Sequence, residues 1–143
     1  MKLNSPAFER NKGPILDIIK ALFKESGQLL EIGSGPGQHA NYFVENLSHI
    51  SWQPSDCSVD YLESIREWSR DKELKNLLDP VLLDLYDENW HKNTPKSLYQ
   101  IVFSMNVIHI ANFSASKSLI EGAAKLLKKD GLLFFYGPFK FEN

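Results

Sequence analysis

The sequence predicts a doubly wound α/β domain built on a mainly parallel sheet. Short apolar runs alternate along the chain with stretches whose apolar residues recur at the spacing of an amphipathic helix. One of these runs, residues 99–105, is apolar almost throughout, which is typical of a buried parallel strand. Because strands that alternate with helices form parallel sheets with right-handed crossovers, we expect helices on both faces. The strand order that we expect is 3-2-1-4-5.

The predicted elements follow in order along the chain. Strands are expected at residues 28–32, 50–53, 81–85, 99–105 and 132–136. Helices are expected at residues 14–24, 38–47, around 61–68 and 116–128. Pro14 suits the first position of a helix, where its missing N–H costs nothing, and Ser58 or Asp60 suits the cap of the third helix. Asp130 and Gly131 are expected to end the last helix.

Composition bounds the class of protein. A chain of 143 residues, 43% hydrophobic and 24% charged, predicts a single globular domain over residues 1–143. The net charge of −2 gives no reason to expect nucleic acid or an anionic membrane as a partner. The single cysteine, Cys57, excludes an intramolecular disulfide and a cysteine-based zinc site. No apolar run approaches the ~18 residues of a membrane span and no signal-peptide core is visible, so we expect a cytoplasmic protein.

The first predicted strand runs into a turn with three glycines, Gly33, Gly35 and Gly37, and a helical pattern follows. Glycine tolerates positive φ and lets a ligand approach the backbone closely. The helix that follows offers unpaired N–H groups and the positive end of its dipole. This stretch therefore predicts a nucleotide-type binding site.

Further candidates come from the strand ends, because ligands of doubly wound sheets lie beyond the carboxyl ends of the strands. The candidates at these ends are Glu31, Asp56, Asp84, Asn106 and Tyr136. A tight connection makes the first helix antiparallel to the first strand, which brings the start of that helix to the same edge. Arg10 and Asn11 are therefore expected at the rim of the site, with a solvated tail as the alternative.

The identity of the ligand has two interpretations. Residues 35–40 fit the fingerprint G-x-G-x-x-A, which allows a nicotinamide dinucleotide and an oxidoreductase. Against this, Glu31 lies two residues before the first glycine, where dinucleotide sites usually keep an apolar residue. Asp84 adds another acidic strand end where a pyrophosphate would need room. Carboxylates around a glycine turn suit a ligand with positive charge and hydroxyls, such as S-adenosylmethionine.

These residues carry a resemblance. Residues 31–37, Glu-Ile-Gly-Ser-Gly-Pro-Gly, resemble motif I of class I S-adenosylmethionine-dependent methyltransferases, which have a Rossmann-like fold. The resemblance implies that Asp56 contacts the ribose hydroxyls and that Asp84 and Leu85 lie near the adenine. In the resembling fold the end of the fourth strand faces the transferred methyl group, which implies a role there for Asn106.

The remaining candidates are assigned in the same frame. Glu31 and the three glycines are expected to bind the cofactor, and His39 and Tyr136 to line the substrate or cofactor rim. His109 follows the fourth strand by a few residues and is the candidate base. Each assignment has a structural alternative: Glu31 could cap nearby N–H groups, Asp56 a helix and Asp84 a turn, and the histidines could be core or surface residues.

A closer similarity covers nearly the whole chain. Residues 5–12, 37–40, 52–56 and 136–139 resemble the small methyltransferase-like 26 family. That resemblance implies the class I fold and strengthens the cofactor assignment more than the reaction, because no settled substrate is implied.

The sheet is expected to differ from that of class I enzymes at its last strands. Those sheets usually carry two strands after the fifth, and the sequence has no material for either, so the fifth strand at residues 132–136 should lie at an edge. Exposed apolar edges pair with other chains, and only Pro138 and Lys140, both past the strand, would blunt this one. We therefore expect the chain to dimerise through this edge, to borrow a strand from a partner, or to aggregate.

The sequence thus predicts methyl transfer from S-adenosylmethionine to a small-molecule acceptor by in-line displacement, which depends mainly on positioning. A base is needed only if the acceptor carries a proton of high pKa. The alternatives are a non-catalytic interaction protein with the methyltransferase fold and, with less support, an NAD-dependent oxidoreductase. No pair of histidines has metal-ligand spacing with a carboxylate, so no metal is expected.

Overall fold

A computed structural model describes residues 2–3, 8–96, 98–105 and 113–136, without the side chains of residues 8–10. Its helices are α1 (Phe8–Leu22), α2 (Gln38–Asn46), α3 (Val59–Arg70) and α5 (Phe113–Leu126), with a short 3-10 helix, η1 (Trp90–Asn93). Its strands are β1 (Gly27–Ile32), β2 (Ile50–Gln53), β3 (Ser55–Asp56), β4 (Val81–Leu82), β5 (Tyr99–Met105) and β6 (Leu127–Tyr136). The α/β class and the mainly parallel sheet are confirmed.

The central sheet has the order β2-β1-β5-β6, and all three of its strand pairs are parallel. The third predicted strand differs, because β4 is only two residues long and pairs with β3 in a separate two-stranded sheet. Pro54 explains the break: it has no N–H to continue the ladder of β2, and its carbonyl accepts the Val81 N–H at 3.2 Å instead. The predicted order 3-2-1-4-5 therefore holds for four strands, with the remaining strand beside the continuation of β2.

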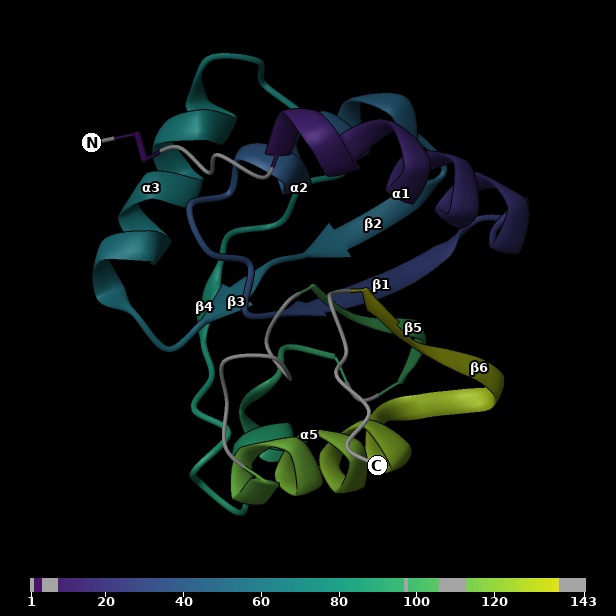
Figure 1. The fold of residues 1–143 in the computed structure, drawn as a ribbon, viewed down its shortest axis with the longest axis vertical. Coiled ribbons are helices and arrows are strands. Elements are labelled where there is room, and N and C mark those ends of the chain that lie inside the picture. The colour runs from purple at the N-terminus through teal and green to yellow at the C-terminus, as the bar shows by residue number, and fades with distance from the viewer. Residues whose placement is uncertain (1, 4–7, 97, 106–112, 137–143) are drawn as a thin grey trace.

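Helices cover both faces of the sheet, as predicted (Figure 1). One face packs under α1 and α2, with Ile15 and Ile19 of α1 and Phe43 of α2 buried against Leu29 and Phe103. The other face packs under α5 and η1 around a separate cluster of buried residues: Leu30, Ile32, Leu83, Trp90, Tyr99, Val102, Leu119, Ala123 and Leu126. This alternation along β1 is the period of two expected of a strand with two buried faces.

The start of α1 differs from the prediction, because Pro14 lies inside the helix and not at its first position. The helix begins at Phe8 instead. The turn before Pro14 includes Lys12, whose Nζ lies 5.3 Å from the centroid of the Tyr42 ring in α2. By contrast, Ser58 does cap α3, because its side chain accepts the Tyr61 N–H at 3.4 Å.

The start of β6 also differs from the prediction. Asp130 and Gly131 do not end the preceding helix: α5 ends at Leu126, and both residues lie within β6. The register passes from Tyr99–Leu127 to Ile101–Leu132, so residues 128–131 leave the ladder, and Asp130 adopts φ +66°. This bulge places Lys128, Lys129 and Asp130 inside the strand, where charges discourage edge pairing. Association through this edge stays a prediction, and these charges inside the strand argue against it.

Candidate functional site

The glycine turn between β1 and α2 depends on backbone conformations that favour glycine. Gly33, Gly35 and Gly37 all have positive φ, of +69°, +60° and +89°. A side chain at Gly37 would meet Cα of Ile65 at 2.8 Å, so this glycine also allows the turn to lie against α3. Among the described residues, a Cβ at Gly35 would meet nothing within 4 Å. That part of the chain therefore leaves space beside the Gly35 backbone, which a bound molecule could approach.

Serine side chains and backbone groups hold this turn against β3. Ser34 donates its N–H to the Ser55 carbonyl at 2.7 Å, and its hydroxyl accepts the Ser55 N–H at 3.0 Å. The Ser55 hydroxyl in turn donates to the carbonyl of Glu31. Both serines are fully buried, so these bonds form where water cannot replace them. The turn is therefore a fixed structure before any ligand is considered.

Asp56 ends β3 directly beside the glycine turn. Its Oδ2 accepts the Gly35 N–H at 2.9 Å and its Oδ1 accepts the Ser58 N–H at 3.0 Å. The residue is 7% exposed, so its carboxylate reaches the surface only at this edge. The alternative in which Asp56 caps a helix is found only in part. Asp56 accepts the N–H of Ser58 just before α3, but the side chain of Ser58 caps the helix. The placement of Asp56 beside the turn suits its predicted ribose contact, which stays a prediction.

Asp84 and Leu85 follow β4 on the same side. The Leu83 N–H donates to the Asp56 carbonyl at 3.1 Å, which brings this segment next to Asp56. Asp84 itself is exposed and forms a turn, because its Oδ1 accepts the Tyr86 N–H at 2.9 Å. Burial raises the pKa of the Cys57 thiol, and the nearby carboxylates of Asp56 and Asp84 raise this pKa further. Both carboxylates thus act on one exposed thiol at this edge of the molecule.

Glu31 lies beneath the turn, not on its surface. It is fully buried, with Oε2 2.6 Å from His39 Nε2 and Oε1 accepting the Trp52 indole N–H at 3.1 Å. His39, predicted at the rim, is only 4% exposed, and among the described residues its buried Nδ1 has no hydrogen-bond partner. Glu31 and His39 therefore support the turn from inside, and ligand contacts by them stay predictions.

The remaining predicted residues are Arg10, Asn11, Asn106, His109 and Tyr136. Asn11 is partly buried in α1, and Tyr136 ends β6 opposite Met105, partly buried against the core. The side chain of Arg10 and the whole of Asn106 and His109 lie outside the described residues. Their assignments stay predictions.

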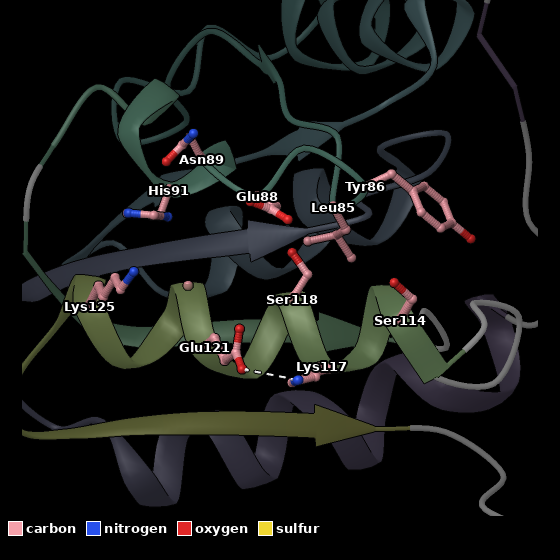
Figure 2. Close-up of a pocket in the computed structure, with 11 residues that line it drawn as sticks. Leu85, Tyr86, Glu88, Asn89, His91, Ser114, Lys117, Ser118, Glu121 and Lys125 are labelled. Carbon is pink, nitrogen blue, oxygen red and sulfur yellow. Dashed lines mark ion pairs between the residues drawn. The ribbon is translucent and has the colours of Figure 1, made fainter.

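A groove of about 520 Å³ begins next to the Asp84 turn and follows α5. Figure 2 shows Leu85, Tyr86 and the residues up to His91 on one side of it, and the side chains of α5 on the other. Its lining is largely polar, and Ser118 Oγ and His91 Nδ1 are buried with no hydrogen-bond partner among the residues that the structure describes. Burial, followed by the positive charges of Lys125 and Lys92, lowers the pKa of His91. The groove therefore combines neutral and charged groups of both signs.

Comparison with known families identifies the chain. A family model described as "Protein of unknown function (DUF938)" matches residues 2–143. The chain belongs to the DUF938 family. That description names no activity, and it does not test the resemblance to the methyltransferase-like 26 family.

Solved structures with the fold of this DUF938 chain include methyltransferases. Coclaurine N-methyltransferase bound to N-methylheliamine and SAH has a TM-score of 0.70 and 22% identity, over 94% of this chain and 38% of that one. The PH0226 protein from Pyrococcus horikoshii OT3 has a TM-score of 0.76 and 15% identity, over 92% and 59%. PKMT2 from Rickettsia typhi in complex with AdoHcy has a TM-score of 0.65 and 20% identity, over 84% and 23%.

These similarities establish the Rossmann-like fold seen in methyltransferase structures. The DUF938 chain spans less than two thirds of the length of each of the three proteins. In the described part of the chain, no helix combines the length and apolar character needed to cross a membrane. The same residues contain no group of three or more metal-ligating side chains.

Sequence reasoning missed the serines that build the site of this DUF938 protein. Ser34, Ser55, Ser64 and Ser104 are all buried, and each bonds backbone around the turn or the ends of the strands. The sequence carried one signal for them, since Ser34 and Ser55 lie beside the residues that end strands. Trp52 is fully buried in the core and also donates its indole N–H to Glu31.

Proposed function

We propose that this chain binds S-adenosylmethionine and transfers its methyl group to a small-molecule acceptor. The observation that carries the proposal is the bond between the Asp56 carboxylate and the Gly35 N–H, 2.9 Å long. It places an acceptor for ribose hydroxyls beside a turn whose backbone is open to a ligand. Two of the similar structures contain SAH or AdoHcy, the product of such a transfer, and this supports the proposal.

The residues present fit this cofactor. The space at Gly35 allows close approach to the backbone, and a Cβ there would take up part of it. Asp56 and Asp84 lie close enough to Cys57 to raise its pKa, so negative charge gathers where the adenosine would lie. Negative charge suits a sulfonium and a ribose diol better than the pyrophosphate of a dinucleotide. We assign Asp56 to the ribose, the Asp84–Leu85 segment to the adenine and the glycine turn to the rest of the cofactor.

When bound, this cofactor supplies a methyl group on a positively charged sulfur, ready for displacement. The chain then has to hold an acceptor in line with that methyl, and positioning of this kind can supply several kcal/mol. We keep Asn106 and His109 as proposals for the acceptor side, with His109 taking a proton if the acceptor has one to lose. The resemblance to the methyltransferase-like 26 family supports the cofactor and leaves the acceptor open.

Calorimetric titration with S-adenosylhomocysteine and, in parallel, NAD tests the proposal. We expect binding of S-adenosylhomocysteine only. Asp56→Ala should weaken it at least about tenfold, since hydrogen bonds to a charged group are lost. Asp79→Ala is the matched control, because Asp79 is also an aspartate but forms an exposed ion pair with Arg66. Binding of NAD, or unchanged affinity in a folded Asp56→Ala variant, would contradict the assignment.

A further inference from the structure

One hydroxyl on α3 joins the N-terminal residues to the glycine turn. The Ser64 Oγ accepts the Leu3 N–H at 2.8 Å and donates to the Pro36 carbonyl at 2.7 Å. Pro36 lies between Gly35 and Gly37, at the centre of the turn. A serine hydroxyl can donate and accept at once, and Ser64 is fully buried, so water does not compete for either bond.

The same face of α3 holds both attached segments. One helical turn beyond Ser64, the Trp68 indole donates to the Leu3 carbonyl at 2.9 Å. Lys2 lies over the Trp68 ring, with Nζ 4.8 Å from its centroid, and pairs with Asp71. Both backbone groups of Leu3 are therefore bonded to α3. Figure 1 shows the N-terminus beside this helix.

The glycine turn packs against α3 at Ile65, the residue after Ser64. The close approach of Gly37 to Ile65, which only glycine allows, puts the turn against the backbone of α3. Ser64 then fixes the orientation of the peptide plane at Pro36. Without the Ser64 hydroxyl, the Leu3 N–H and the Pro36 carbonyl would both lose this partner, and the turn would open more often.

We propose that Ser64 is a positioning residue for the cofactor and couples N-terminal docking on α3 to the geometry of the glycine turn. This inference rests on the proposed function, because the turn is taken to hold S-adenosylmethionine. Coupling of this kind is reciprocal: bound cofactor should also tighten the docking of Lys2 and Leu3. Ser64 acts through the Pro36 carbonyl, and Trp68 acts through Leu3, one step further from the turn.

Two variants and a matched control test the coupling. Ser64→Ala removes both bonds of the Ser64 hydroxyl. Trp68→Phe removes the indole bond to the Leu3 carbonyl and keeps an aromatic ring beneath Lys2, so the bond from Ser64 to Pro36 stays in place. Ser69→Ala is the control, because the Ser69 hydroxyl on the same helix donates only locally, to the Arg66 carbonyl at 2.9 Å. Each protein is titrated with S-adenosylhomocysteine, and amide hydrogen exchange of residues 33–38 is measured without ligand.

We expect Ser64→Ala to raise the dissociation constant of S-adenosylhomocysteine at least about fivefold and Trp68→Phe about two- to fivefold, with Ser69→Ala unchanged. Exchange of residues 33–38 should quicken in the same order. If Trp68→Phe leaves both readouts at the wild-type value, the coupling is wrong, and this variant decides the matter should Ser64→Ala fail to fold. If wild-type protein does not bind S-adenosylhomocysteine, the proposed function fails, while exchange in the ligand-free protein still tests the coupling.

Discussion

The face of the sheet under α1 and α2 buries a carboxylate and a histidine, whereas the face under α5 and η1 is packed with apolar and aromatic side chains. On the first face Glu31 and His39 lie among Phe43, Trp52 and other core residues. On the second face, in the described parts of α5, η1 and β6, no charged side chain is buried. Both faces pack on the same strands, so the strands themselves do not explain the difference in buried polar groups.

The buried polar groups lie where the backbone must take an unusual path. Glu31, Ser34, Ser55 and Asp56 surround a turn with three residues at positive φ. Burying an ionisable side chain costs several kcal/mol of folding free energy unless it is paired. Among the described residues, the buried carboxyl groups of Glu31 and Asp56 both lie at this turn. The α5 face is held by close packing, as in the approach of the Trp90 ring to Gly122. The comparison suggests that variants on the first face change ligand binding and variants on the second change stability alone.

The largest expected effect comes from breaking the buried pair. His39→Leu leaves the Glu31 carboxyl group buried without its hydrogen bond to His39, and removing one member of such a buried pair costs about 3–5 kcal/mol of unfolding free energy. Urea denaturation measures this. His49→Leu is the matched control, since His49 bonds only the Phe23 carbonyl, at 2.9 Å, and should cost about 1 kcal/mol.

A double variant sharpens the same point. Glu31→Met with His39→Leu removes both polar side chains, and replacing a buried polar pair by apolar residues is often close to neutral. We expect it to recover at least half of the loss. If the single variant costs no more than the His49 control, Glu31 does not depend on His39.

On the α5 face, Gly122→Ala should destabilise the protein by about 1–3 kcal/mol, the range for overpacking a core. Its Cβ would lie 2.3 Å from a ring carbon of Trp90, which is itself fully buried and bonded to the Ser118 carbonyl. The control is Gly13→Ala in α1, where nothing lies within 4 Å and a gain of up to about 1 kcal/mol is expected from helix propensity. Thermal unfolding measures both, and affinity for S-adenosylhomocysteine should not change in either.

At the glycine turn, the effects on stability and binding should separate. Gly35→Ala forces a side chain into positive φ, which costs about 1–2 kcal/mol, less than the pair or packing variants at their upper limits. Because no atom lies within 4 Å of the new Cβ, folding should survive, while affinity for S-adenosylhomocysteine falls further than stability predicts. Unchanged affinity in calorimetry would mean that this glycine serves turn geometry alone.

The strands and the edge of the sheet that carries the site could be predicted from the sequence, because apolar runs and glycine turns are local signals. Residues 99–105 match β5, and 50–53 match β2. The start of α1 was not predicted, because Pro14 suits a first helical position and the helix nevertheless begins earlier, at Phe8. The bulge at Asp130 was hidden for a related reason: Asp-Gly after a helical pattern looks like a helix end, and only the pairing of β6 with β5 makes it a strand.

The sequence predicted which residues gather at the site better than it predicted what each of them contacts. Sequence position predicted that Asp56 lies beside the glycine turn and that Asp84 lies near Asp56, because the ends of parallel strands share one edge. Burial decided what Glu31 does, and its partners His39 and Trp52 come from separate elements whose approach no local pattern encodes. The link from Leu3 through Ser64 to Pro36 was invisible for the same reason.

The smallest expected effect concerns the rate at which Cys57 is alkylated. Burial first, and then the carboxylates of Asp56 and Asp84, raise the pKa of this exposed thiol above its usual range. Since the thiolate is the reactive form, a raised pKa lowers the thiolate fraction at pH 8, and alkylation by iodoacetamide should be slower than for a free cysteine. The rate should rise with pH through the raised pKa. Asp56→Asn removes one of the charges, so it should lower the pKa and speed the reaction about two- to threefold at pH 8, with burial still acting.

Asp84→Asn should act in the same direction by less, because Asp84 contributes less than Asp56 to the shift. Asp79→Asn is the control and should leave the rate unchanged, as Asp79 pairs with Arg66 away from the thiol. Bound S-adenosylhomocysteine would add a second readout, since a ligand lying between the two carboxylates should shield Cys57 and slow alkylation in the wild-type protein. Equal rates in all three variants would show that the two carboxylates do not converge on this edge, and the proposed adenosine position would lose its electrostatic support.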